Sequence, residues 1–157
     1  MEVIDLTSDR HISQYLSTPE VRSRLGVDPV VPSNLSLCSA EIGLAFESQM
    51  DEYRLTYHYV AALLERGVKA LIYVGTYDWI CNFVGNEAWT LNLEWTKQKE
   101  FASQPLREWI VDGKKAGMMR SAAGLTFATV EGAGHMVSCF KTQVHVLTEL
   151  LIYFLYN

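Results

Sequence analysis

A short apolar run in the middle of the chain limits most strongly what it can fold into. Residues Ala70-Leu-Ile-Tyr-Val74 carry no charged side chain, and Gly67 and Gly75 lie on either side of the run. A continuous apolar run of this kind is typical of a parallel strand that is covered on both faces and paired at both edges. The sequence therefore predicts a buried strand over 68–75 inside an α/β sheet.

The rest of the pattern predicts helices that alternate with strands. Ser17-Thr18-Pro19-Glu20 indicates a helix start with a cap and a first-turn proline, and Asp112-Gly113 is a strong hairpin signal. The expected helices cover 12–25, 40–66, 84–94 and 141–156, the expected strands cover 68–75, 106–111, 116–120 and 125–130, and 97–105 is a polar connection. This order predicts a single α/β domain over 1–157.

These strands are too few for a self-sufficient sheet. Two core strands and a hairpin leave the apolar run with an unpaired edge, and such an edge is a site of aggregation. We therefore expect an incomplete sheet that is completed by strands from outside these residues.

Composition excludes several classes of function. The formal net charge is −5 and there is no basic block, which argues against nucleic acid or anionic lipid as a partner. No apolar run reaches the roughly 18 residues of a membrane span, and the acidic start of the chain does not resemble a signal peptide. Asn34-Leu35-Ser36 matches an N-glycosylation acceptor and favours a secretory origin.

The chain has three widely spaced cysteines, Cys38, Cys81 and Cys139. Their spacing does not match the ligand pairs of a structural zinc site. They are either three buried free thiols, or Cys38 pairs with a cysteine outside this chain because the count is odd.

Two acid–base residues follow the two expected core strands. Asp78 comes after the strand over 68–75, and His135 comes after the strand over 125–130. Ligand chemistry in open α/β sheets lies at such carboxyl ends of strands. An Asp followed by a His forms the last two members of a Ser…Asp…His order, but no serine of the chain has the glycine neighbours of a Gly-x-Ser-x-Gly motif.

Longer blocks around these two residues resemble a known family. The stretch ALIYVGTYDWICNFVGNEAWT over 70–90 resembles the catalytic-aspartate segment of serine carboxypeptidases. Residues 94–95, 100–104 and 107–109 resemble its continuation in the carboxypeptidase Y group, and Gly132-Ala-Gly-His-Met-Val137 resembles the catalytic-histidine segment. The resemblance covers nearly the whole chain and implies the C-terminal portion of an α/β-hydrolase fold, without a cofactor or a metal.

The resemblance assigns roles to four residues. Asp78 would be the triad acid and His135 the triad base, so that His135 moves the proton of a serine hydroxyl while Asp78 orients the imidazole. Cys81 and Met136 resemble residues that line the substrate pocket, and filling of the core is the alternative for both. Asn82 is a candidate cap of the following helix.

The sequence also departs from the family pattern. Cys38 resembles a family cysteine that forms a disulfide with the N-terminal region, and that partner is absent here. Ser138-Cys139-Phe140-Lys141 stands where a proline and an acidic residue are usual, and Thr76 stands where an acidic residue is common. The nucleophile elbow, the glycine-rich oxyanion segment and the acidic residues that recognise the terminal carboxylate are missing.

The resemblance therefore implies a serine-type carboxypeptidase that acts on the C-termini of peptides and proteins in the vacuole or after secretion. The chain would supply Asp78 and His135 and would be inactive without the N-terminal part of the enzyme. The first alternative is a non-catalytic remnant that acts as a binding or interaction protein. The second alternative is an unrelated small α/β binding domain.

Overall fold

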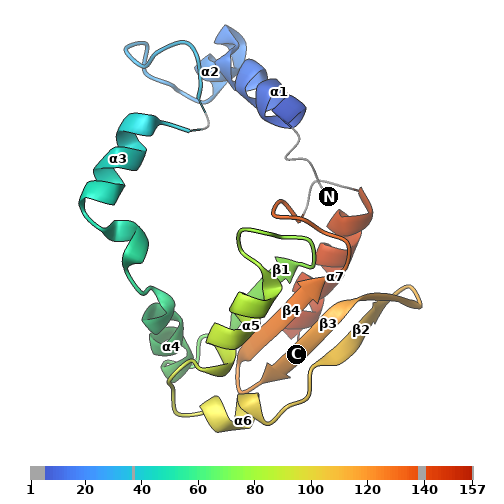
Figure 1. Cartoon of the computed structure of the whole chain (residues 1–157). Coiled ribbons are helices and arrows are strands. Elements are labelled where there is room, and N and C mark those ends of the chain that lie inside the picture. The colour runs from blue at the N-terminus through green and yellow to red at the C-terminus, as the bar shows by residue number, and fades with distance from the viewer. Residues whose placement is uncertain (1–5, 37, 138–140, 157) are drawn as a thin grey trace. The chain divides into compact units, whose positions relative to one another are not determined.

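The computed structural model describes residues 6–36, 38–137 and 141–156, and the chain divides into two compact units after Arg54 (Figure 1). The described part of the first unit is helical. Its elements are α1 (Leu6–Ser17), α2 (Pro19–Arg24), α3 (Ala40–Ser48) and the short 3₁₀ helix η1 (Asp51–Tyr53). The loop between α2 and α3 is held by two hydrogen bonds, from the Leu35 amide to Ser17 Oγ (2.8 Å) and from the Arg22 guanidinium to the Val31 carbonyl (2.7 Å).

The prediction of one continuous helix over 12–25 is wrong. It is divided into α1 and α2 at Thr18, which has an extended backbone (φ −67°, ψ 140°). The cause is Pro19, because proline disfavours a helical conformation in the residue before it. Pro19 begins α2 as predicted, but the Thr18 hydroxyl donates to the Tyr15 carbonyl (2.8 Å) and does not cap α2.

The expected helix over 40–66 is also wrong, because it is three separate pieces. Helix α3 ends at Ser48, η1 follows, and α4 covers Tyr57–Glu65. The break contains Met50 in the left-handed region (φ 54°), which an uninterrupted helix excludes. Helix α3 buries no residue, so no tertiary packing supports a long helix here.

The second unit holds an α/β sheet, as predicted. Its described strands are β1 (Ala70–Gly75), β2 (Arg107–Val111), β3 (Lys114–Ala122) and β4 (Leu125–Val130), in the order β1-β4-β3-β2. The β1–β4 pair is parallel and the other two pairs are antiparallel. Its helices, besides α4, are α5 (Phe83–Leu91), α6 (Gln98–Ala102) and α7 (Lys141–Tyr156). Helix α6 lies in the expected polar connection, where the fully buried Phe101 anchors it.

The predicted hairpin is confirmed between β2 and β3. Asp112 and Gly113 both have positive φ (50° and 72°), as a type I′ turn requires. Gly117 in β3 leaves room for a neighbouring indole, since a Cβ there would lie 1.8 Å from the Thr129 carbonyl oxygen and 2.6 Å from Trp109 Nε1. Trp109 uses that room to donate to the Thr129 carbonyl (2.9 Å).

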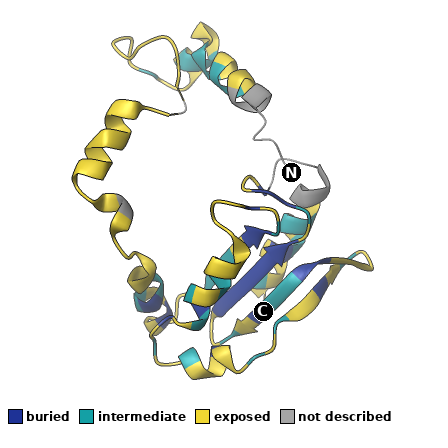
Figure 2. Ribbon diagram, viewed as in Figure 1, coloured by how far each residue is buried: buried dark blue, intermediate teal, exposed yellow. Residues whose placement is uncertain are grey.

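Strand β4 forms the centre of two cores, because its side chains alternate between the two faces of the sheet. Leu125 and Phe127 pack with α4 and α6, and Ala128 and Val130 pack with Leu150 of α7. Figure 1 shows α5 in front of the sheet and α7 behind it, and Figure 2 shows β4 buried along its length. The second unit therefore has helices on both faces of its sheet.

Strand β1 does not have the two partners that its apolar sequence predicts. Within the described residues it pairs with β4 alone, and Tyr73 is 43% exposed. The sheet is thus open at β1, in agreement with the expected incomplete sheet. No helix in the described part of the chain is long and apolar enough to cross a membrane.

Candidate active site

The loops that follow β1 and β4 pack directly against each other. Because these strands are parallel neighbours, both loops emerge at the carboxyl ends of the strands, on the same side of the sheet. Gly75 permits the close approach, since a Cβ there would lie 2.1 Å from the Ala133 carbonyl oxygen. The Thr76 and Tyr77 amides donate to the carbonyls of Val130 (3.0 Å) and Ala133 (2.9 Å).

A threonine side chain adds a further link between the two loops. Thr76 Oγ1 accepts a hydrogen bond from the Gly132 amide at 2.9 Å. In the sequence, Thr76 is only a departure from the family pattern, at a position where an acidic residue is common. In the structure its uncharged hydroxyl connects the loop that carries Asp78 to the loop that carries His135.

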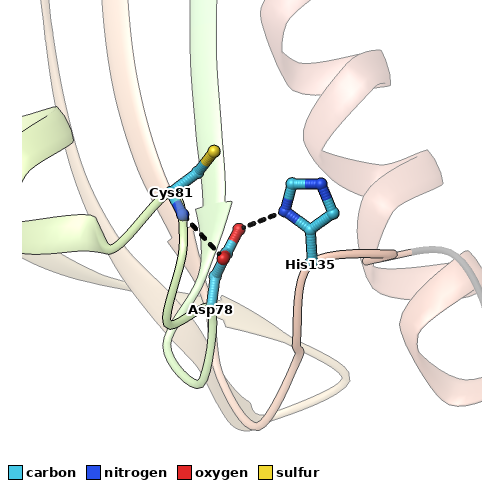
Figure 3. Close-up of side chains that lie close together, drawn as sticks. All are labelled: Asp78, Cys81 and His135. Atoms are coloured by element: carbon cyan, nitrogen blue, oxygen red, sulfur yellow. Dashed lines mark hydrogen bonds and ion pairs between the residues drawn. The ribbon is translucent and has the colours of Figure 1, made fainter. Parts of the chain in front are cut away.

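This packing brings Asp78 and His135 together, and their predicted hydrogen-bond contact is confirmed. Asp78 Oδ2 lies 2.9 Å from His135 Nδ1, and Asp78 Oδ1 accepts the Cys81 amide at 2.9 Å (Figure 3). The carboxylate is 5% exposed, whereas the imidazole is 60% exposed. Both carboxylate oxygens are therefore engaged at a buried position, and the ring reaches toward solvent.

This geometry suits proton transfer by the imidazole. With the proton on Nδ1, the ring donates to the carboxylate and leaves Nε2 as a proton acceptor. No described residue forms a hydrogen bond to Nε2. A buried carboxylate on the opposite nitrogen also stabilises the charged form of the ring when Nε2 gains a proton.

The start of α5 supports the Asp78 loop. Asn82 Oδ1 accepts the Gly85 amide at 2.9 Å, so its predicted role as a helix cap is confirmed. Asn86 donates to the carbonyls of Cys81 (2.9 Å) and Asn82 (3.0 Å), and it accepts from the indole of Trp89 (3.0 Å). The sequence interpretation missed Asn86, and its four-residue spacing from Asn82 was the available signal.

Cys81 and Met136 are exposed, which contradicts the core-filling alternative for both. Neither lines the cavity of about 410 Å³, which lies at the amino ends of β1 and β4, away from Asp78, and is bordered by Leu64, Trp95 and Ala123 among others. The substrate-binding role of Cys81 and Met136 stays a prediction.

The described cysteines are not buried as one prediction had them. Cys38 and Cys81 are free and exposed, which contradicts the alternative of three buried thiols, and pairing of Cys38 with a cysteine outside this chain stays a prediction. Cys139 and the departures at 138–140 lie outside the described residues. Asp78, Cys81 and His135 together offer a carboxylate oxygen, a sulfur and a ring nitrogen that all lie within 4.8 Å of one another, an arrangement that could hold a metal ion.

A second Asp–His contact was not predicted. His145 Nε2 lies 3.0 Å from Asp112 Oδ2, where α7 meets the turn of the β2–β3 hairpin. Both side chains are more than half exposed, and no cysteine of the described residues joins them in a metal-ligating group. The two residues are 33 positions apart, so no local pattern could indicate the contact.

Comparison with known proteins assigns the chain to a family. The profile of the family described as serine carboxypeptidase matches residues 2–151. Carboxypeptidase Y homolog A of Neosartorya fischeri is 38% identical over 132 residues, which are 81% of this chain and 24% of that protein. A vacuolar serine-type carboxypeptidase of Saccharomyces cerevisiae is 35% identical over 133 residues, covering 83% of this chain and 26% of that protein.

A solved structure agrees with the sequence comparison. It is Kex1(delta)p, a prohormone-processing carboxypeptidase from Saccharomyces cerevisiae, with a TM-score of 0.72 at 25% identity. The match covers 92% of this chain and 31% of that chain.

The sheet, its covering helices and this structural match define an α/β-hydrolase fold. Its sheet is not closed. The chain belongs to the serine carboxypeptidase family and is similar to the carboxypeptidase Y group within it. It spans about a quarter of the length of these two curated relatives.

Proposed function

We propose that Asp78 and His135 are the acid and base of a serine-type carboxypeptidase centre that releases C-terminal residues from peptides and proteins. The observation that supports this most directly is the 2.9 Å contact between a buried carboxylate and an exposed imidazole at adjacent strand ends. Membership of the serine carboxypeptidase family gives that contact its proposed chemistry.

The proposed reaction has two steps, acylation and deacylation, and His135 transfers one proton in each. His135 Nε2 accepts the proton of a serine hydroxyl as its oxygen attacks the carbonyl of the last peptide bond. The same nitrogen then donates that proton to the leaving amine, which departs as the free C-terminal residue and leaves an acyl-enzyme. Water attacks the acyl group next, with His135 again accepting and returning the proton, while Asp78 keeps the ring in one tautomer.

The proposed nucleophile comes from outside these 157 residues. The sequence contains no Gly-x-Ser-x-Gly motif and no glycine-rich oxyanion segment. Members of a catalytic triad act as a unit, so a base without a nucleophile gives little acceleration. We therefore expect the chain by itself to be inactive toward peptides.

The open edge of β1 supports a location for the nucleophile segment. A further parallel strand paired with β1 would have its carboxyl end beside that of β1, next to the Asp78 loop. The N-terminal part of the same enzyme is the proposed source of this strand.

The proposed compartment is the vacuole or the secretory route. The support is a vacuolar relative that is 35% identical over 133 residues, together with the exposed acceptor sequence at Asn34. A non-catalytic remnant that binds peptides or proteins is the competing function, and the missing nucleophile is the observation that favours it.

A complementation experiment tests the proposal. The chain is combined with the N-terminal segment of a fungal carboxypeptidase Y homologue, and hydrolysis of a blocked dipeptide is measured. We expect turnover by the mixture but not by either part alone, with a loss of about 10³-fold or more in His135→Ala. His145→Ala, which removes the other Asp–His contact, is the matched control and leaves turnover unchanged.

Two outcomes would contradict the proposal. Turnover that survives His135→Ala would remove the assigned base. A stable complex with no turnover would instead favour the non-catalytic remnant.

A further inference from the structure

The Cys81 thiol lies beside the Asp78–His135 contact, and the proposed proton transfer does not use it. The sulfur of Cys81, a carboxylate oxygen of Asp78 and a ring nitrogen of His135 all lie within 4.8 Å of one another. Figure 3 shows the three side chains side by side at the end of β1. Cys81 and His135 are exposed, so an ion from solvent can reach this group.

The donor set favours one class of cation. Sulfur, imidazole nitrogen and carboxylate oxygen are the three donor types that Zn²⁺ takes in proteins, and cadmium shares the preference for thiolate. Mg²⁺ and Ca²⁺ require six or more oxygen ligands, whereas this group offers a single carboxylate. The chemistry of the group therefore selects a zinc-class ion over a hard cation.

The geometry needs only a small adjustment. Ligand atoms in a tetrahedral zinc shell are roughly 3.3–3.7 Å apart, so the widest separation has to close by about 1 Å. Rotation of the exposed Cys81 and His135 side chains supplies that movement. Asp78 stays in place, because its Oδ1 holds the Cys81 amide at 2.9 Å.

We propose that Asp78, Cys81 and His135 bind one zinc-class divalent cation, with water as the fourth ligand. Binding releases the thiol proton to solvent, and coordination through Nδ1 shifts the ring proton from Nδ1 to Nε2, so that the imidazole binds in its neutral form. The cation thus replaces the Asp78–His135 hydrogen bond. Binding itself is independent of the proposed function, whereas the expected inhibition of the enzyme rests on it.

Cadmium titration tests the binding on the full 157-residue chain. Cys38→Ser and Cys139→Ser are introduced together, so that Cys81 is the only thiol. We expect an ultraviolet sulfur-to-cadmium charge-transfer band that saturates at one ion per chain. Zn²⁺ displaces the cadmium, and Mg²⁺ at the same concentration does not.

Two substitutions identify the ligands. Cys81→Ser abolishes the band. His135→Gln removes a ligand and weakens cadmium binding by at least about 10-fold, because loss of a mere outer-shell partner already costs that much at metal sites. His145→Gln is the matched control, because no thiol among the described residues joins that His–Asp pair and Cys139 is already serine in this background, so its loss leaves the affinity unchanged. Since His135 is 60% exposed, His135→Gln keeps the fold, which an unchanged thermal melt verifies.

Equal cadmium affinity in the parent chain and in His135→Gln would overturn the proposal, because a lone thiol would then account for the band. Inhibition is measured separately, as loss of turnover with Zn²⁺ in the complemented enzyme. Cadmium binding without any turnover in that mixture would contradict the proposed function alone. Absence of the band would contradict the metal site alone.

Discussion

At the scale of single residues, the Asp78–His135 contact depends on neighbours that transfer no proton. The two residues lie on different loops, 57 positions apart, so their 2.9 Å separation is set by the packing of one loop on the other. Gly75 allows that packing because any Cβ there would clash with the Ala133 carbonyl. Thr76 then joins the loops through its hydroxyl.

Replacement of Thr76 by valine tests this link. The change removes the hydrogen bond to the Gly132 amide while keeping the shape of the side chain, and one such bond contributes roughly 0.5–1.5 kcal/mol. We expect faster hydrogen exchange at the Gly132 amide and a lower midpoint of denaturation by urea. Thr76→Ser keeps the hydroxyl and restores both values, and identical exchange in the valine variant would show that the hydroxyl is dispensable.

At the scale of elements, short helices around the sheet depend on bonds at their ends. At the start of α5, Asn82 accepts a capping hydrogen bond from the Gly85 amide, whereas Thr56 before α4 makes no side-chain capping bond. Helix α4 ends at Glu65, whose carboxylate accepts both the amide (2.6 Å) and the hydroxyl (2.8 Å) of Thr96 in the segment before α6. Such short helices are not stable on the strength of helix propensity alone, so these bonds help to hold them in place.

Loss of the α5 cap is expected to destabilise the second unit. Asn82→Ala removes the acceptor for the Gly85 amide and should cost about 1 kcal/mol in the free energy of unfolding. Thr56→Ala at the start of α4 is the matched control, because no capping bond is lost there. Urea denaturation of both variants compares them, and equal midpoints would argue against the cap.

The Glu65–Thr96 contact predicts a pH dependence of stability. Hydrogen bonds from the Thr96 amide and then from its hydroxyl lower the pKa of Glu65 below its ordinary value of 4.5. A lowered pKa in the folded state means that the carboxylate stabilises the fold above the unfolded-state pKa, and that this contribution is lost as the pH falls through the folded-state pKa.

Comparison of the parent chain with Glu65→Gln measures this contribution. We expect the parent to have the higher denaturation midpoint at neutral pH, and the two midpoints to converge at a pH below the folded-state pKa. A difference that stays constant over the whole acidic range would contradict the assigned hydrogen bonds.

At the scale of the whole molecule, the second unit has an incomplete sheet and a large apolar surface. Strand β1 is unpaired along one edge within the described residues, and Tyr73 on it is partly exposed. In the first unit, none of the side chains that the structure describes is buried. Under the proposed function, we expect the N-terminal part of the enzyme to cover these surfaces.

The isolated chain is therefore expected to be poorly soluble and to self-associate with rising concentration. Exposed unpaired strand edges pair with other chains, and a lysine on the edge strand suppresses such pairing. Tyr73→Lys should reduce the association that light scattering or sedimentation measures. Tyr77→Lys, the same change in the loop beyond the strand, is the control and should have little effect.

Several features followed from local sequence because local forces determine them. The apolar run of β1, the Asp112-Gly113 turn and the Asn82 cap each depend on a few consecutive residues, and all three were predicted. The family also followed from sequence, through the blocks around Asp78 and His135. Local sequence did not indicate the break at Met50 or the short helix around Phe101, because burial and tertiary packing decide those.

The amino-acid sequence by itself thus determined which strands form, which acid and base residues follow them and which family the chain belongs to. Only the tertiary structure decided that Asp78 and His135 touch, that Thr76 joins their loops and that Cys81 is exposed beside them. The physical reason is sequence separation. Those contacts arise from the parallel pairing of β1 with β4, whose registered residues are 55 positions apart, as in Ala70 opposite Leu125.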